Sequence, residues 1–167
     1  MTTSPDHGKA VLRPTFKLLA DPVHCLALGF GSGLAPVAPG TFGSLVGLVF
    51  AFALAPLGLA WNLLAVAVAV GAGIWICGES ARRLGVHDHP AIVWDEIAGM
   101  MIAMLAAPDA WWGAPLAFAL FRLFDIAKPW PIREIDHGLG GGTGIMLDDV
   151  LAGLFAALGL TIVGYVT

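Results

Sequence analysis

The sequence predicts an all-α protein, a small polytopic membrane helical bundle with four or five apolar spans and a short N-terminal interfacial segment. Three observations lead to this fold class. The 167 residues are 58% hydrophobic and only 12% charged, with a mean hydropathy of +0.85, whereas a soluble domain carries roughly 25% charged residues. The apolar residues gather in long runs, and the basic residues fall beside alternate ends of those runs. A chain of this length suits a single domain.

The N-terminal part of the chain, residues 1–28, is predicted to be a cytosolic lead that ends in an interfacial helix. It has no apolar run typical of a cleavable signal peptide. Residues 29–44 are rich in glycine, proline and serine and are predicted to form an irregular loop. Residues 29–167 are predicted to form the membrane domain.

Five apolar segments follow the lead. They comprise residues 44–60, 61–77, 97–108, 111–124 and 145–166. A spanning helix needs about 20 residues, so the first, second and fifth segments qualify. The third and fourth are short and need their polar flanks to complete a crossing. Four spans, or five with one partial span, both remain open.

The basic residues define the orientation. They are Lys9, Arg13, Lys17, Arg82, Arg83, Arg122, Lys128 and Arg133. All eight fall before the first span, between the second and third, or around the end of the fourth, and the loops after the first and third spans contain none. The positive-inside rule therefore places the N-terminus and these basic loops in the cytosol. No basic tract suggests a nucleic-acid partner, and the sequence does not predict an oligomeric state.

Acidic residues are predicted to gather at the same depth. Asp95 and Glu96 open the third span, Asp125 closes the fourth, and Asp148 and Asp149 open the fifth. With the orientation above, all five lie at the cytosolic interface. A lone anion in hydrocarbon is costly, so such a cluster indicates a functional site.

The third and fifth spans carry matching stripes of small residues. They read Asp95–Gly99–Ala103 and Asp149–Gly153–Ala157. Residues four apart share one helix face, and small residues at that spacing let membrane helices approach closely. We expect the two stripes to pack together, or against a common neighbour, and to bring Asp95 close to Asp149.

Converging carboxylates repel each other unless a cation lies between them. Oxygen ligands of this kind suit Mg²⁺, so Asp95, Glu96, Asp148 and Asp149 are the predicted metal ligands.

Nearby basic and glycine-rich segments are suited to phosphate. Arg122 and Lys128 flank Asp125 and would offset the charge of phosphoryl oxygens. Gly40 and Thr41 lead directly into the first span. Glycine lets the backbone approach a ligand closely, and the free N–H groups at a helix start can bind phosphate. The glycine-rich residues 138–144 precede the fifth span and could do the same.

The remaining residues that could bind a metal or act as nucleophiles are not predicted to form a site. The triplet His87-Asp88-His89 resembles a metal motif, but it lies in a proline-bounded loop and is interpreted as solvated. Cys25 and Cys77 form no CxxC motif and are predicted to be free, structural thiols. No Ser–His–Asp pattern is present.

Three motifs in this order resemble those of the bacterial phosphatidylglycerophosphatase A family. They are GSGLAPVAPGTFGS, VWDEIAGM, and FRLFDIAKPWPI followed by GGTGIMLDDVLAG. The resemblance extends from about Gly29 to the C-terminus. It implies a Mg²⁺-dependent lipid phosphatase of the bacterial inner membrane that converts phosphatidylglycerophosphate to phosphatidylglycerol. The family's acidic positions correspond to the five acids named above, with Lys128, Gly40 and Thr41 beside them.

The predicted catalytic residues are Asp95, Asp125, Lys128 and Asp149. A water attack with a carboxylate as base, and an aspartyl-phosphate formed at Asp125 or Asp149, both remain open. The alternative to an enzyme is an ion-coupled transporter or another membrane binding protein that uses the same acidic cluster. Transporters usually place ionisable groups near the bilayer midplane, whereas these acids lie at one face.

Overall fold

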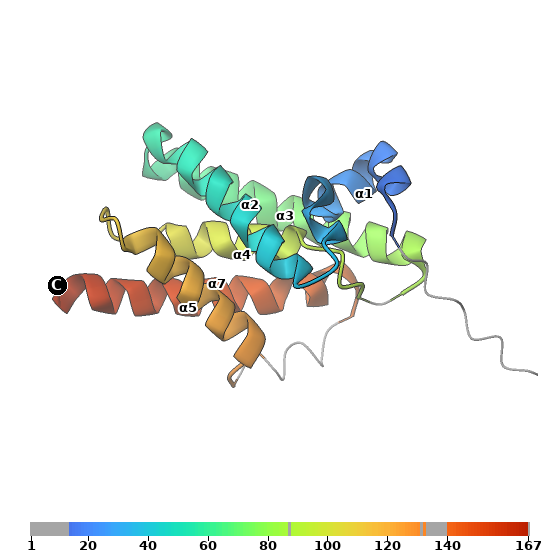
Figure 1. Cartoon of the computed structure of the whole chain (residues 1–167). Helices are drawn as coiled ribbons and strands as arrows, with labels where there is room; N and C mark the ends of the chain where they lie inside the picture. The colour runs from blue at the N-terminus through green and yellow to red at the C-terminus, as the bar shows by residue number, and fades with distance from the viewer. Residues whose placement is uncertain (1–13, 87, 131, 133–139, 167) are drawn as a thin grey trace, which may run out of the picture.

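The structure is a computed structural model, and it describes residues 14–86, 88–130, 132 and 140–166. Among these residues it contains helices and no strands, so the predicted all-α class is confirmed (Figure 1). The α-helices are α1 (Pro22–Ala27), α2 (Pro39–Leu54), α3 (Leu59–Leu84), α4 (Trp94–Met104), α5 (Gly113–Ala127) and α7 (Gly141–Val166). Short 3-10 helices are η1 (Phe16–Ala20), η2 (Gly29–Leu34) and η3 (Ala55–Leu57).

Within the part of the chain that the structure describes, three helical segments are long and apolar enough to cross a membrane. They are Pro39–Leu57, which combines α2 with η3, Leu59–Leu84 and Gly141–Tyr165. With 11 and 15 residues, α4 and α5 extend about 16 and 22 Å at 1.5 Å per residue, less than the roughly 30 Å hydrocarbon core. The predicted third and fourth segments therefore form helices, and both are short, as their apolar runs indicate.

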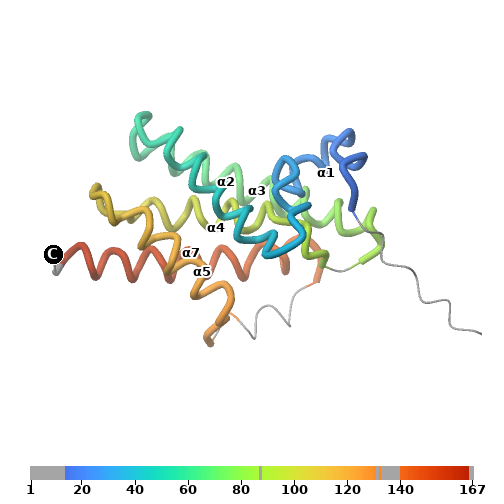
Figure 2. Tube along the Cα trace, in the orientation of Figure 1, coloured from blue at the N-terminus to red at the C-terminus, as the bar shows by residue number. Residues whose placement is uncertain are grey.

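The long helix α7 makes extensive contacts with the rest of the bundle. It packs against α3, α4 and α5, and α2 covers the other side of α4 (Figures 1 and 2). The helices alternate in direction, so the starts of α2, α4 and α7 and the end of α5 meet at one end of the bundle. The polar residues singled out from the sequence lie at that end.

The predicted packing of the third and fifth spans is confirmed. A Cβ atom added at Gly153 would lie 2.5 Å from the carbonyl oxygen of Gly99, and one added at Gly99 would lie 2.7 Å from that of Asp149. The backbones of α4 and α7 thus touch at these two glycines. Along α7 the buried stripe continues through Ala156 rather than through the expected Ala157, which is partly exposed.

The prediction of an irregular loop over residues 29–44 is wrong in part. η2 occupies its first half, and α2 already begins at Pro39, a residue whose fixed φ suits a first helical turn. The glycines in this stretch serve helix packing. A Cβ atom at Gly43 would lie 2.7 Å from Cβ of Val93, and one at Gly47 would lie 2.6 Å from the carbonyl oxygen of Ile97. Glycine there lets α2 approach α4 closely.

The short helix α1 is tied to the end of α3 by Asp21. Its carboxylate accepts hydrogen bonds from the backbone N–H groups of Val23 and His24, at 2.9 and 3.2 Å, and pairs with Arg83 at 2.7 Å. These contacts satisfy free amides at the helix start. The hydrogen bond from His24, with help from Val23 and Arg83, holds the pKa of Asp21 below its ordinary value of 3.8.

We predict that Asp21→Ala lowers the melting temperature at neutral pH. A lowered carboxyl pKa stabilises the fold above the unfolded value and loses that effect as the pH falls through the folded value. The gap in melting temperature between Asp21→Ala and the unaltered protein should therefore shrink below pH 3.8. Thermal unfolding followed by tryptophan fluorescence across this range measures it. A gap that is the same in acid would contradict the capping role.

Candidate metal and phosphate site

Three carboxylates converge where α4 meets α7. Asp95 and Glu96 lie in the first turn of α4, and Asp149 lies in α7 beside them. One oxygen from each of the three lies within 4.8 Å of the others. Asp95 is 8% and Asp149 3% exposed. The close contact of the helices at Gly99 and Gly153 is what brings these side chains together.

The three carboxylates have the chemistry of a site for a hard divalent cation. One buried oxygen on each of them, Oδ1 of Asp95, Oε2 of Glu96 and Oδ1 of Asp149, has no hydrogen-bond partner. A buried anion without a partner is costly, and adjacent anions repel each other. Mg²⁺ binds one or two carboxylates with further oxygen ligands, so this donor set fits it. The positive end of the α4 dipole also favours Asp95 and Glu96 as anions.

Arg122 joins the start of α2 to the end of α5. Its Nη1 donates to the carboxylate of Asp125, one turn later in α5, and lies 3.4 Å from the hydroxyl of Ser44. That hydroxyl donates to the carbonyl of Gly40 at 2.8 Å. The guanidinium is thus held by two helices. Ser44 was not predicted as a site residue, although it lies one turn after Gly40 in the glycine-rich motif.

Gly40 lies directly against the acidic cluster. A Cβ atom there would lie 2.1 Å from Oε1 of Glu96 and 3.2 Å from Nη1 of Arg122. A larger residue at this position would displace the side chain of Glu96 and crowd that of Arg122. The neighbouring Thr41 donates its backbone N–H to the carbonyl of Ala38 at 2.9 Å, so this amide already has a partner within the chain.

Lys128 and Asp148 form an ion pair beside the three carboxylates. Nζ of Lys128 lies 2.6 Å from Oδ2 of Asp148, and Oδ1 of Asp148 accepts the backbone N–H of Asp149 at 3.0 Å. Lys128 ends α5 in a left-handed conformation with φ of 40°, an uncommon backbone for this residue type. Asp148 is therefore placed against the lysine, outside the group of three.

Asp125 lies close to Arg122 and to the group of three carboxylates. It interacts electrostatically with both Glu96 and Asp149 as well as with Arg122. Around the described residues of the site, five carboxylates face only two basic side chains, Arg122 and Lys128. A divalent cation held by Asp95, Glu96 and Asp149 would offset the repulsion among these carboxylates.

The other singled-out residues lie apart from this cluster. His87 lies outside the described residues, and Nδ1 of His89 accepts the backbone N–H of Ala91 at 3.1 Å. Partial burial lowers the pKa of His89. Cys25 and Cys77 are free thiols, as predicted. Of the glycine-rich residues 138–144, those from Gly141 on form the start of α7.

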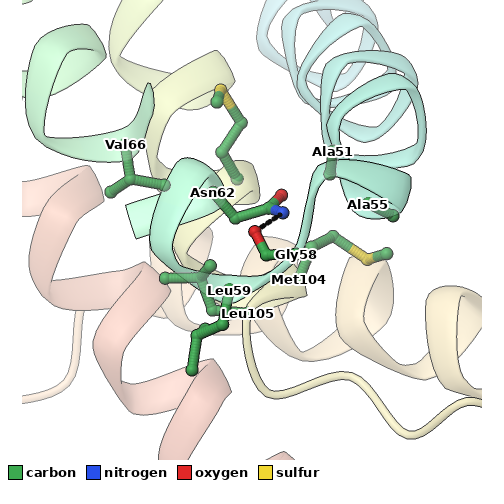
Figure 3. Close-up of a pocket in the computed structure, with 9 residues that line it drawn as sticks. Ala51, Ala55, Gly58, Leu59, Asn62, Val66, Met104 and Leu105 are labelled. Atoms are coloured by element: carbon green, nitrogen blue, oxygen red, sulfur yellow. Dashed lines mark hydrogen bonds between the residues drawn. The ribbon is translucent and has the colours of Figure 1, made fainter. Parts of the chain in front are cut away.

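A hollow of about 180 Å³ lies at the opposite end of the bundle (Figure 3). It is formed where α2, α3 and α4 meet, and Asn62 there donates to the carbonyl of Gly58 at 2.8 Å. None of the described residues lining it is titratable. Met104, at the end of α4, lies in its wall, a full helix length from Asp95 at the start. This hollow is not the acidic site.

An apolar helical bundle with an acidic site at the helix ends, flanked by the basic side chains of Arg122 and Lys128, fits a membrane phosphatase. A family model described as phosphatidylglycerophosphatase A matches residues 25–164. The chain belongs to the phosphatidylglycerophosphatase A family. This membership confirms the expected resemblance and the expected enzyme class.

Curated relatives agree with this assignment. A phosphatidylglycerophosphatase A of Escherichia coli (strain K12) is 43% identical over 168 residues, covering 99% of this chain and 95% of the relative. One of Haemophilus influenzae is 48% identical over 142 residues, covering 84% and 87%. A putative phosphatidylinositol-3-phosphatase of Bacteroides thetaiotaomicron is 39% identical over 149 residues, covering 84% and 92%. No solved structure matches the chain.

Proposed function

We propose that this protein hydrolyses the terminal phosphate monoester of phosphatidylglycerophosphate, giving phosphatidylglycerol and phosphate, with Mg²⁺ as cofactor. The observation that carries the proposal is the set of three partnerless oxygens on Asp95, Glu96 and Asp149. The names of two relatives support the lipid substrate. The name of a third mentions another lipid phosphate, so the choice among lipid phosphates is part of the test.

The carboxylates and the basic side chains of the site would have different parts in this reaction. Asp95, Glu96 and Asp149 would hold the cation, which when bound supplies a Lewis acid for the phosphoryl group and lowers the pKa of bound water. Arg122 and Lys128 would offset the remaining negative charge of the phosphate.

The proton and the phosphoryl group can then move by two routes. In the first, a carboxylate takes a proton from the attacking water, the new P–O bond forms as the ester P–O bond breaks, and the proton is passed on to the leaving oxygen of the lipid alcohol. In the second, the carboxylate of Asp125 or Asp149 attacks phosphorus, the ester P–O bond breaks and the lipid alcohol leaves with a proton, and water then hydrolyses the aspartyl-phosphate to phosphate and the free carboxylate. Asp125 already accepts a hydrogen bond from Arg122. This contact favours Asp125 as the residue that orients Arg122, and we therefore prefer the first route.

We propose that the site lies at the cytosolic face of the bacterial inner membrane. Arg82 and Arg83 lie at the end of α3 and Lys128 at the end of α5, on the side where α4 and α7 begin. Basic residues at one end of apolar helices favour the cytosol. A lipid headgroup could reach the carboxylates there while its tails stay in the bilayer.

The substrate is tested with a panel of lipid phosphates presented in detergent micelles. Phosphate release by the purified protein is measured with phosphatidylglycerophosphate, phosphatidate, lysophosphatidate and phosphatidylinositol 3-phosphate, each with Mg²⁺. We expect the highest kcat/KM for phosphatidylglycerophosphate. Preference for another member would reassign the substrate, and no release from any would favour the transporter or binding alternative.

We predict that Lys128→Ala raises KM for the lipid phosphate more than it lowers kcat. A charged hydrogen bond to phosphate is lost, so kcat/KM should fall about ten- to a hundred-fold. Lys17→Ala is the matched control, since Lys17 is exposed on η1. An unchanged KM would contradict a phosphate-binding role for Lys128.

A further inference from the structure

We infer that the groove between α5 and α7 binds one acyl chain of the lipid substrate. The inference rests on the proposed function and assigns the part of the site that recognises the lipid tail. The groove has a volume of about 320 Å³ and is lined by apolar residues and one glycine. Its walls include Phe124, Pro129, Trp130, Phe155, Leu158 and Ile162.

The groove begins next to Lys128 of the charged site. Pro129 and Trp130 directly follow Lys128, whose Nζ pairs with Asp148 at 2.6 Å. Phe124 lies one turn earlier in α5, where its carbonyl accepts the backbone N–H of Lys128 at 2.9 Å. A phosphate held by Lys128 would therefore lie at one end of the apolar groove.

The depth of the groove matches a lipid whose phosphate lies at the carboxylates. At 1.5 Å per residue, Phe155 is about 9 Å and Ile162 about 20 Å further along α7 than Asp149. α7 runs from the charged end of the bundle into its apolar body. The polar headgroup would lie between Asp149 and Phe155, and an acyl chain would lie between Phe155 and Ile162.

A glycine opens the groove at the depth where the chain would lie. Gly159 lines it, and a Cβ atom there would meet only Cδ1 of Leu120, at 3.4 Å. Near the mouth, the rings of Phe124 and Phe155 pack 5.8 Å apart. A larger side chain at Gly159 would fill the groove without a backbone clash.

The test therefore uses Gly159→Leu with Gly164→Leu as its matched control. Gly164 lies in the same helix, is exposed, and a Cβ atom there would meet only Cγ of Pro108 at 3.7 Å. Each variant is assayed with long-chain phosphatidylglycerophosphate and with a short-chain analogue that bears the same headgroup. For Gly159→Leu we expect kcat/KM to fall about ten-fold with the long-chain lipid only, equivalent to about two buried methylene groups. Gly164→Leu should change neither.

Ile162→Trp gives a second, independent reading, because Ile162 lies at the deep end and is 58% exposed. It should impair the long-chain substrate and spare the short-chain one. Equal losses with both substrates, or equal effects of Gly159→Leu and Gly164→Leu, would overturn the acyl-chain assignment while leaving the phosphatase proposal in place. No release from either substrate by the unaltered protein would overturn both.

Discussion

Replacing Asp149 with asparagine is expected to reduce phosphate release at least ~100-fold, because one of the three carboxylates proposed to hold the cation is lost. Asp149 is 3% exposed and lies among the three converging carboxylates. Asparagine keeps the shape of the side chain and removes its charge. The measurement is kcat/KM for phosphatidylglycerophosphate in micelles with saturating Mg²⁺.

The same variant has an expected effect on stability that separates a cation site from a structural one. Without Mg²⁺, Asp149→Asn should melt at the same temperature as the unaltered protein or higher, since it removes repulsion among buried anions. Addition of Mg²⁺ should raise the melting temperature of the unaltered protein more than that of the variant. Asp109→Asn is the control, because Asp109 is exposed in the loop that follows α4. Full activity in Asp149→Asn would contradict the role of Asp149.

Replacing Gly153 with leucine is expected to separate α4 from α7 and to abolish activity. A Cβ atom at Gly153 would lie 2.5 Å from the carbonyl oxygen of Gly99, so the backbones must move apart. Overpacking of this kind costs about 1–3 kcal/mol of the free energy of unfolding. A displacement of about 1 Å at a reacting centre can lower the rate about 100-fold.

The matched control for Gly153→Leu is Gly71→Leu. Gly71 is exposed on α3, and no other atom lies within 4 Å of a Cβ atom built there. Melting temperature and phosphate release are measured for both variants. Gly71→Leu should resemble the unaltered protein. If Gly153→Leu did so as well, the close contact of α4 with α7 would not be what holds Asp95 beside Asp149.

The position of the acids could be predicted from the sequence because membrane topology restricts it strongly. Charges that flank apolar runs must lie at an interface, and alternating helices bring the starts of α4 and α7 to the same end. The pairing of Gly99 with Gly153 followed from their matching spacing. Membrane topology and helix periodicity together therefore predict that Asp95 lies near Asp149.

Other features depend on contacts that the one-dimensional pattern does not contain. The adjacent residues Asp148 and Asp149 look equivalent in the sequence, yet successive helical residues point about 100° apart. Asp149 accordingly joins the cluster, and Asp148 pairs with Lys128. Glycines in residues 29–44 suggested a loop, whereas Gly43 and Gly47 serve close packing of α2 against α4.

The measurement that tests the central claim most directly is the effect of chelation on phosphate release. The purified protein is assayed with phosphatidylglycerophosphate in detergent micelles containing excess EDTA, and Mg²⁺ is then added back in steps. Our account predicts that release stops with EDTA and returns with Mg²⁺, because Asp95, Glu96 and Asp149 hold the cation that the reaction needs. Release that continues undiminished in EDTA would contradict it.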